Sequence, residues 1–308
     1  MPRRRQRRLR RILRSAVRDL GVKRIVTTKV EHHAVLYPAL ALQKEFDIQV
    51  DFVNIKSDGS IDVTHLVELL SQEVKTLVSL MHVNNEVGVV LDLERIAIIC
   101  KEHNALFHSD TVQSVGKTEI DLKTLPIDFI SASAHKFHGP KGIGFAFIRK
   151  NSGLQPLLLG GEQEKGMRGG TESIYQVAGM AKALEMAYAN LDSERACISD
   201  LKEYCANQLA QRFPNSKIVG SKNNFYNIIN VVLPLSADKT GMLLFHLDMK
   251  GIAVSRGSAC QSGSSNPSHV LAEILSPEEL VQPSLRISFS HYNTKEEIDY
   301  LLEVLASV

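Results

Sequence analysis

Two residues of this sequence, Lys136 and Asp110, could act together in covalent chemistry. Lys136 ends the polar stretch Ser133-Ala134-His135-Lys136, and Asp110 stands within His108-Ser109-Asp110-Thr111-Val112-Gln113. A lysine in a partly desolvated pocket can form a Schiff base with an aldehyde, and an aspartate can keep a pyridine nitrogen protonated so that the ring withdraws electrons. Because most lysines are solvated surface groups, neither residue is strong evidence alone. Their interpretation depends on the elements that position them.

Three polar clusters, including the two that hold Lys136 and Asp110, each follow a short apolar run. The clusters cover residues 82–86, 108–113 and 133–136, and the preceding runs cover 76–81, 105–107 and 127–130. Helical patterns lie between the runs, which predicts part of an α/β sheet. Ligands of such sheets bind outside the carboxyl ends of the strands, where all three clusters fall. We therefore expect Lys136 and Asp110 to converge on one small molecule, and pyridoxal phosphate (PLP) is a molecule that uses both.

The remaining periodicity predicts a large domain and a smaller one. Further strands are expected at 24–27, 48–55 and 142–149, and in the smaller domain at 227–233, 253–255 and 285–289. Helices are expected at 34–46, 173–212, 239–250 and 295–306. The predicted organisation is an Arg-rich leader at 1–18, either disordered or a non-native start, a PLP-binding domain at 19–190 and a C-terminal domain at 191–308.

Composition is that of a globular enzyme. Of the 308 residues, 44% are hydrophobic and 23% charged, enough for a large core. No apolar stretch suggests a membrane span, and the four cysteines show neither a zinc spacing nor a disulfide framework, which predicts a reducing, cytoplasmic setting. Residues 1–18 hold nine Arg and no acid, so the rest of the chain carries 27 Lys and Arg against 34 Asp and Glu. This mildly acidic body makes nucleic acid an unlikely partner.

Six motifs, in order along the chain, resemble those of one enzyme family. They are Glu31-His32-His33-Ala34-Val35, Met81-His82-Val83-Asn84-Asn85-Glu86-Val87-Gly88, Asp110-Thr111-Val112-Gln113-Ser114-Val115-Gly116, His135-Lys136-Phe137-His138-Gly139-Pro140-Lys141-Gly142, Met167-Arg168-Gly169-Gly170-Thr171 and Gly257-Ser258-Ala259-Cys260. From about Leu13 to the C-terminus, the chain resembles the cysteine desulfurases of the NifS and IscS type, within the class V aminotransferases of PLP fold type I. The resemblance implies an α/β fold with a mostly parallel, seven-stranded-type sheet flanked by helices, and a smaller C-terminal α+β domain.

The resemblance also implies roles for particular side chains. Lys136 would hold PLP and move a proton at the substrate Cα, Asp110 would contact the ring nitrogen, and His32, a third catalytic residue beside Lys136 and Cys260, would stack on the ring and move protons. The other implied contacts are Gln113 and Asn85 to the phenolic oxygen, Ser133 and His135 to the phosphate, Thr171 to the phosphate of the partner subunit's cofactor, and Arg286 with Asn85 to the substrate carboxylate. A homodimer with shared active sites follows. Asn84 is expected to support a turn.

Cys260 is the expected nucleophile. It lies in the run of small residues 255–267, which predicts a mobile surface loop on which a cysteine can react as a thiolate. By resemblance, its thiolate attacks the sulfur of L-cysteine, L-alanine is released, and the persulfide is carried to an iron–sulfur scaffold or another sulfur-acceptor protein. A transient iron–sulfur ligand role for Cys260 is the one metal function expected. Cys100 is interpreted as a packed helix residue, and Cys197 and Cys205 fall on a polar helical stretch.

Two alternatives stay open. One is another class V PLP enzyme, a selenocysteine lyase or an aminotransferase. The other is an inactive truncated paralogue that acts as a binding partner, because relatives continue upstream to a Gly-Ala-Thr-Glu loop that holds the cofactor phosphate, whereas the Arg-rich leader stands here. The leader is interpreted as a truncated or misannotated start, a solvated arm, or a targeting or binding segment. Without that loop, weak PLP binding and slow turnover are expected.

Overall fold

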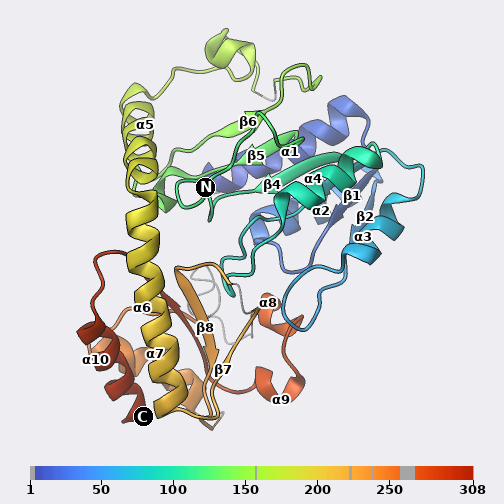
Figure 1. Cartoon of the computed structure of the whole chain (residues 1–308). Helices are drawn as coiled ribbons and strands as arrows, with labels where there is room; N and C mark the ends of the chain where they lie inside the picture. Colours follow the sequence, from blue (N-terminus) through green and yellow to red (C-terminus); the bar gives the residue numbers. More distant parts are fainter. Residues whose placement is uncertain (1–3, 157, 222–223, 237–238, 257–267, 308) are drawn as a thin grey trace. The chain divides into compact units, whose positions relative to one another are not determined.

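The structure, a computed structural model, describes residues 4–156, 158–221, 224–236, 239–256 and 268–307, with the backbone alone at 4–11, 240 and 241. The chain divides into two compact units (Figure 1). The large unit holds Met1–Asn54, Asp62–Val83 and Leu91–Leu191, and the small unit holds Ile55–Ile61, Asn84–Val90 and Asp192–Val308. The division after Leu191 lies one residue from the expected boundary, but two short earlier segments belong to the small unit.

The large unit is built on a sheet of strand order β2-β1-β3-β4-β5-β6. Its strands are β1 (Arg24–Thr27), β2 (Gln49–Phe52), β3 (Thr76–Ser79), β4 (Leu106–Asp110), β5 (Phe129–Ser131) and β6 (Ala146–Ile148). Its helices are α1 (Arg4–Leu20), α2 (His33–Phe46), α3 (Val63–Leu70), α4 (Leu93–Glu102) and α5 (Ile174–Ala189), with 3₁₀ turns η1 (Ala134–Lys136) and η2 (Gln163–Gly166). β6 pairs antiparallel with β5, and the other pairs are parallel. The expected fold class is confirmed, although the described residues supply six strands to this sheet where a seven-stranded type was expected.

Three of the central strands are buried along their whole length. Every residue of β1, β3 and β5 is buried, as expected for parallel strands that have helices on both faces. One face of the sheet presents Ile25, Leu77 and Phe129 to a core shared with α1 and α2. Such burial fixes the register, and with it the point at which each strand ends.

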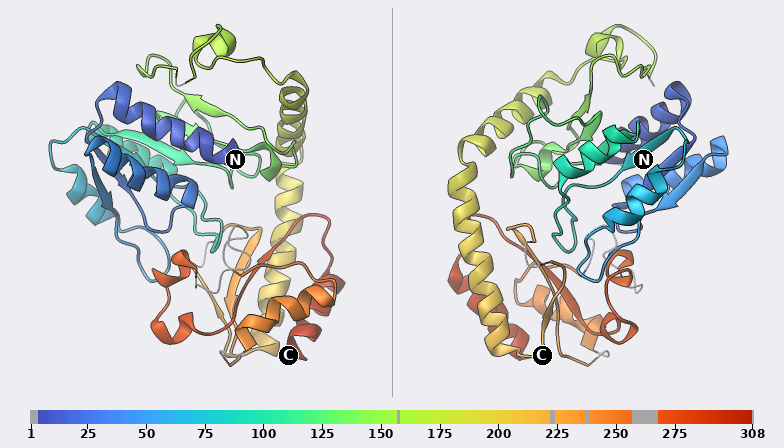
Figure 2. Two further views of the ribbon diagram at one scale, coloured as in Figure 1. Left: turned by 180° about the vertical axis from the view of Figure 1, so that it is seen from behind. Right: turned by 45° about the vertical axis from the view of Figure 1, so that its right-hand side comes forward.

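Helix α1 departs from the expectation of a disordered leader. It extends from Arg4 to Leu20, and Ile12, Leu13, Ala16 and Val17 are buried in the core of the large unit. Figure 2 shows α1, in dark blue, beside α2. Because these apolar residues recur with helical spacing, they form one stripe that packs inward, while the Arg14 guanidinium pairs with a carboxylate of α2. Around residues 12–17, the segment is therefore a packed helix rather than a disordered leader, and Arg14 lies on its outer face.

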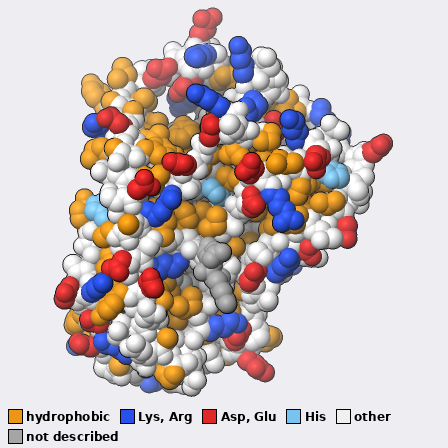
Figure 3. Space-filling view, in the orientation of Figure 1, with side chains coloured by type: hydrophobic (Ala, Val, Ile, Leu, Met, Phe, Trp, Pro, Cys, Tyr) orange, Lys and Arg blue, Asp and Glu red, His pale blue; other side chains and the backbone are white. Residues whose placement is uncertain are grey.

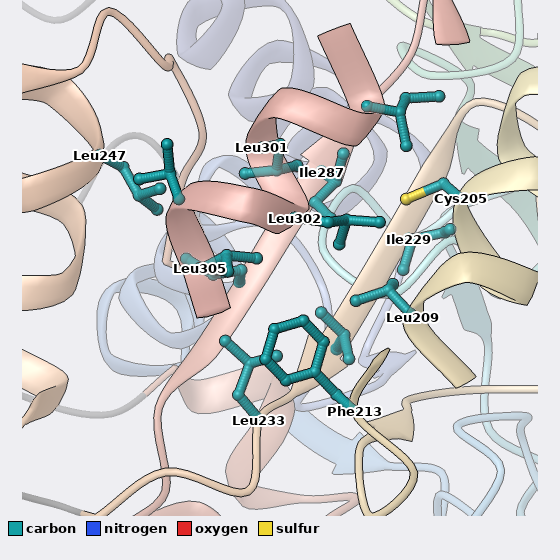
Figure 4. Packing of buried hydrophobic residues seen from close by; sticks show 14 of the residues in the cluster. Cys205, Leu209, Phe213, Ile229, Leu233, Leu247, Ile287, Leu301, Leu302 and Leu305 are labelled. Atoms are coloured by element: carbon teal, nitrogen blue, oxygen red, sulfur yellow. The ribbon is translucent and has the colours of Figure 1, made fainter. Parts of the chain in front are cut away.

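The small unit is an antiparallel sheet of order β7-β8-β9 covered by helices. Its strands are β7 (Lys217–Ile218), β8 (Ile228–Val232) and β9 (Ser284–Ser288), and its helices are α6 (Leu191–Arg212), α7 (Thr240–Met249), α8 (His269–Ala272), α9 (Pro277–Leu280) and α10 (Lys295–Ala306). Figure 4 shows part of its core, in which Cys205 of α6 lies beside Ile229 of β8. No helix among the described residues is long and apolar enough to cross a membrane.

Several element predictions differ in detail from the structure, and three of the differences are as follows. The helix expected at 173–212 is two helices, because the chain leaves helical geometry at Asn190 between α5 and α6. The strand expected at 253–255 is reduced to one bridge between Ser255 and Arg286. The strand expected to end at Phe107 continues to Asp110, because β3 and β5 pair with it on both sides.

Candidate active site

The carboxyl ends of β3, β4 and β5 bring His82 together with the clusters at 108–113 and 133–136. The backbone N–H of His82, after β3, donates to the carbonyl oxygen of Asp110, at 3.1 Å. Asp110 ends β4 and lies opposite Ser131 of β5 in the register. Two residues beyond Ser131, Ser133 begins the turn that carries Lys136. The large unit therefore assembles at one edge the polar groups that follow these strands, whereas Asn84, Asn85 and Glu86 belong to the small unit.

Lys136 is held on a tight turn. The chain forms the 3₁₀ turn η1 after Ser133, and the N–H of Gly139 donates back to the carbonyl oxygen of Ala134 at 2.8 Å. A Cβ atom at Gly139 would lie 2.9 Å from the Ala134 Cβ, closer than such atoms normally approach. Lys136 is half-buried, and His135 is exposed. The glycine is thus required by the close approach, and the turn fixes where the lysine backbone sits.

Ser133 carries a buried hydroxyl group that the described part of the chain leaves without a partner. Its side chain is 1% exposed, and its Oγ has no hydrogen-bond partner among the described residues. A buried hydroxyl left unpaired costs roughly 1 to 3 kcal/mol, so such groups usually mark a ligand or an ordered water. An anionic oxygen bound here would satisfy it. Ser133 therefore fits the phosphate contact that the resemblance implied.

Asp110 is buried and oriented by the backbone. Its side chain belongs to a residue that is 2% exposed, and its Oδ1 accepts a hydrogen bond from the N–H of Val112 at 3.0 Å. Gln113, three residues later, is also buried. Both side chains thus belong to the β4 edge of the large unit. A carboxylate held in this way can keep a protonated ring nitrogen in place.

A buried histidine connects the three strands that carry these groups. His108 of β4 contacts the Ser79 hydroxyl of β3 at 2.9 Å through Nδ1 and the Ser131 hydroxyl of β5 at 3.1 Å through Nε2. Burial lowers the pKa of His108 to about 4, despite the opposing charge of Asp110. Burial likewise lowers the pKa of His82 to about 4. Both rings are therefore neutral near pH 7, and that of His108 serves as a hydrogen-bonding group between the strands.

His32 lies where the chain passes from β1 into α2. It is the N-cap of α2, and its Nδ1 accepts from the N–H of Ala34 at 3.0 Å. This contact places the ring proton of neutral His32 on Nε2. The neighbouring Glu31 is buried and accepts from the N–H of Met81, which connects this segment to the end of β3. The His33 ring stacks on the ring of Tyr37, so it packs within α2.

Thr171 stands on the exposed chain that precedes α5. α5 contains no buried residue, and its exposed side chains include Ile174, Tyr175 and Met186. In Figure 3, hydrophobic side chains gather over this helix. An apolar helix face of this kind typically marks a protein contact.

Two of the expected substrate contacts belong to the small unit. Asn84 uses its side-chain oxygen to accept from the N–H groups of Glu86 and Val87, which confirms its expected role in a turn. The carbonyl oxygen of the buried Asn85 accepts from Nη1 of Arg286 at 2.9 Å. Arg286 of β9 is half-buried, and its Nη2 lies 3.4 Å from the Ser255 hydroxyl. These two neutral acceptors orient the guanidinium.

Of the described cysteines, Cys100 and Cys205 are poor nucleophiles, and Cys197 lies on α6, outside the family motifs. Burial raises the pKa of Cys100, as expected for a packed helix residue, and also that of Cys205, each to about 12. Cys205 was expected on a polar stretch, but it faces the core of the small unit because α6 packs against β8. Cys197 is exposed on α6. Cys260 lies outside the described residues, and no cluster of metal-binding side chains occurs within the described ranges.

Sequence reasoning missed several polar residues around the site. It passed over Glu31, the histidine bridge at His108, and the bond between Ser268 and Glu86. The available signal was the polar triplet His108-Ser109-Asp110 directly after an apolar run, since polar side chains that continue a buried strand must find partners on neighbouring strands. The partners themselves are distant in sequence.

Comparison with known proteins agrees with this geometry. Residues 12–301 match the Aminotransferase class-V family. Relatives named cysteine desulfurase IscS are 38% identical in Dictyoglomus turgidum and 40% identical in Clostridium botulinum, and the matches cover 93% and 92% of this chain and 72% and 71% of those proteins. A solved NifS-like protein matches with a TM-score of 0.87 at 32% identity, over 98% of this chain and 80% of that one. The chain therefore belongs to the class V aminotransferases and, within them, to the cysteine desulfurases of the NifS and IscS type.

Proposed function

We propose that this protein is a PLP-dependent L-cysteine desulfurase that yields L-alanine and transfers the sulfur to an acceptor protein. The observation that carries the proposal is the meeting of Asp110 with the turn of Ser133 and Lys136 at the ends of adjacent parallel strands. This arrangement occurs in a chain whose relatives are cysteine desulfurases.

The residues present fit the cofactor. Lys136 would bind its aldehyde, Asp110 its ring nitrogen and His32 its ring face. Gln113 and Asn85 would contact the phenolic oxygen. Ser133, whose buried Oγ has no partner in the described ranges, would bind the phosphate with His135. When bound, PLP supplies an electron sink for reactions at the substrate Cα.

Each protein group then has a separate task in the reaction. Arg286 and Asn85 would hold the substrate carboxylate, since a guanidinium binds carboxylates in a bidentate geometry. Lys136 would take a proton from Cα and return protons to the carbon skeleton. The Cys260 thiolate would attack the substrate sulfur, so that an S–S bond forms as the C–S bond breaks and its electron pair remains with carbon. The products are L-alanine and a Cys260 persulfide.

The raised pKa values of Cys100 and Cys205 support Cys260 as the nucleophile. A thiol with a pKa of about 12 holds almost no thiolate near neutral pH, and Cys100 and Cys205 are in that state. Cys197 is exposed but lies outside the family motifs. A persulfide on Cys260 would then be passed to an iron–sulfur scaffold or another sulfur acceptor.

A homodimer is part of the proposal. α5 has no buried residue, and Ile174 and Tyr175 at its start are 71% and 93% exposed. These side chains directly follow Thr171, which would contact the phosphate of the cofactor in the partner subunit. A second copy of the chain covering this face would bury the apolar side chains and supply the shared phosphate contact together.

The proposal can be tested by locating the lysine to which the cofactor is covalently attached. Purified protein supplied with PLP and reduced with borohydride should carry the label on Lys136, and Lys136→Ala should lose it. Lys141, five residues later and in the same glycine-rich stretch, is the matched control, so Lys141→Ala should keep the label. Incubation with L-cysteine should then yield L-alanine. Label on Lys141, or pyruvate and ammonia as the only products, would contradict the proposal.

A further inference from the structure

The turn formed by residues Asn84–Val90 is tightly bonded within itself. Besides the two bonds to the Asn84 side chain, the N–H of Asn84 donates to the carbonyl oxygen of Val89 at 2.9 Å, and the N–H of Gly88 donates to that of Asn84 at 3.0 Å. Gly88 adopts φ 74°, a conformation that other residues rarely adopt. The groups on this turn are therefore held in fixed positions within the small unit.

Three hydrogen bonds connect Asn85 and Glu86 to other parts of the small unit. The Asn85 carbonyl oxygen accepts from Arg286 of β9, and the Glu86 carbonyl oxygen accepts from the Asn230 side chain of β8 at 3.1 Å. The Glu86 carboxyl oxygen accepts from the Ser268 hydroxyl at 2.5 Å. These bonds connect one dipeptide to the central strand β8, to the edge strand β9 and to the start of α8.

The Ser268 hydroxyl uses its full bonding capacity. It donates to Glu86 and accepts from the N–H groups of Val270 and Leu271 at 3.1 and 3.3 Å, which caps α8. Glu86 is 1% exposed, so its carboxyl group has no alternative contact with bulk water. Loss of the contact would therefore leave a buried carboxyl group with one partner fewer.

The two ends of the segment that carries Cys260 are both connected to this dipeptide. Before it, Ser255 exchanges two backbone hydrogen bonds with Arg286, whose side chain bonds to Asn85. After it, Ser268 bonds to Glu86. We propose that Glu86 is a positioning residue for sulfur removal, because it holds Ser268 and with it the end of the segment from which Cys260 acts. This inference rests on the proposed function.

Substitutions at Ser268 separate the contact with Glu86 from the cap of α8. Asp and Asn both cap helices well, but Asp cannot donate to a carboxylate, whereas Asn can. Ser268→Asp should slow L-alanine formation about tenfold, the scale of a charge-assisted hydrogen bond replaced by repulsion, with PLP content and L-cysteine affinity within twofold of wild type. Ser268→Asn should stay within about threefold of the wild-type rate. Combining Ser268→Asp with Glu86→Gln should restore the rate, because the Gln amide donates to the new carboxylate.

A second readout does not depend on turnover. The rate at which iodoacetamide alkylates Cys260, measured by mass spectrometry against Cys197 in the same sample, should change at least about threefold in Ser268→Asp and return in the double variant. Ser276→Ala is the matched control, since it removes the capping hydroxyl of α9, a helix of equal length, and with it the bond accepted from the N–H of Glu279. It should leave both readouts unchanged.

The outcomes separate the two ideas. Wild-type rate and alkylation ratio in Ser268→Asp, or failure of Glu86→Gln to rescue them, overturns the positioning role. Equal losses in Ser268→Asp, Ser268→Asn and Ser276→Ala also overturn it, because the effect would then be general loss of stability. Absence of L-alanine from the wild-type chain, with the alkylation pattern as expected, refutes the proposed function and with it a role in sulfur removal, and supports only the control of Cys260 alkylation by the contact between Glu86 and Ser268.

Discussion

Mild acid should destabilise the large unit through its buried histidines, His82 and His108. Burial lowers the pKa of each from 6.5 to about 4. Between these values the unfolded chain binds protons that the folded chain does not, so stability is full above pH 6.5 and falls as the pH decreases toward 4. The linkage relation gives a loss of about 2 kcal/mol per histidine between pH 7.5 and pH 5. The two residues together should cost about 4 kcal/mol, a large part of the stability of a typical domain.

His108→Gln tests this quantity directly. The glutamine amide can still contact the Ser79 and Ser131 hydroxyls but does not titrate. Unfolding by urea should be followed by far-ultraviolet circular dichroism at the two pH values, since the chain contains no tryptophan. His108→Gln should lose about 2 kcal/mol less than wild type between them, and the comparison cancels the contribution of carboxyl groups common to both.

A half-exposed histidine supplies the control. His103 follows α4, and His103→Gln should show the wild-type loss of stability. If His108→Gln and wild type lose the same free energy of unfolding, the neutral state of the buried ring is not what limits stability in acid, and the reasoning from burial is refuted.

Three further outcomes test the site. Ser133→Ala should weaken PLP binding about tenfold in a fluorescence titration, whereas Ser109→Ala, which removes another buried hydroxyl without a described partner, should not. Cys260→Ser should keep the spectral response to L-cysteine but form no persulfide detectable by mass spectrometry, and an unchanged desulfurase rate would exclude Cys260. Gly139→Ala should lower the melting temperature and slow PLP attachment, because the added methyl group meets Ala134 at 2.9 Å; unchanged values would show that the turn can relax.

The sequence was most informative about where strands end. Apolar runs that stop at a polar cluster predicted the edge at which Asp110 and the turn of Ser133 and Lys136 lie together. This worked because burial on both faces of a parallel strand requires apolar residues until the chain leaves the sheet. It failed at His108, which remains in β4 because Ser79 and Ser131 on the neighbouring strands bond to its ring. Such compensation depends on tertiary contacts that no local pattern contains.

The Arg-rich segment shows a second limit of local reading. Composition counts every residue equally, so the arginines before Leu20 outweighed the apolar residues among them. The structure depends on position instead, because Leu13 and Ala16 are fully buried and Ile12 and Val17 nearly so. One packed stripe is sufficient to form a helix on the core, whatever the charge of its other faces. Periodicity was therefore the better guide than charge.

The polar cluster at 82–86 shows why function was harder to locate than fold. It is continuous in sequence, yet His82 and Val83 belong to the large unit and Asn84, Asn85 and Glu86 to the small unit. The N–H of Leu91 donates to the His82 carbonyl oxygen at 2.8 Å, so the two ends of the segment Asn84–Val90 lie close together where the chain returns to the large unit. A pattern that continues along the chain gives no sign of such a division, because each half is polar for a different reason. His82 ends a buried strand, whereas Asn85 and Glu86 bond to β8, β9 and the cap of α8. The different roles of the residues within the cluster at 82–86 thus follow from the partners that each residue has in its own unit.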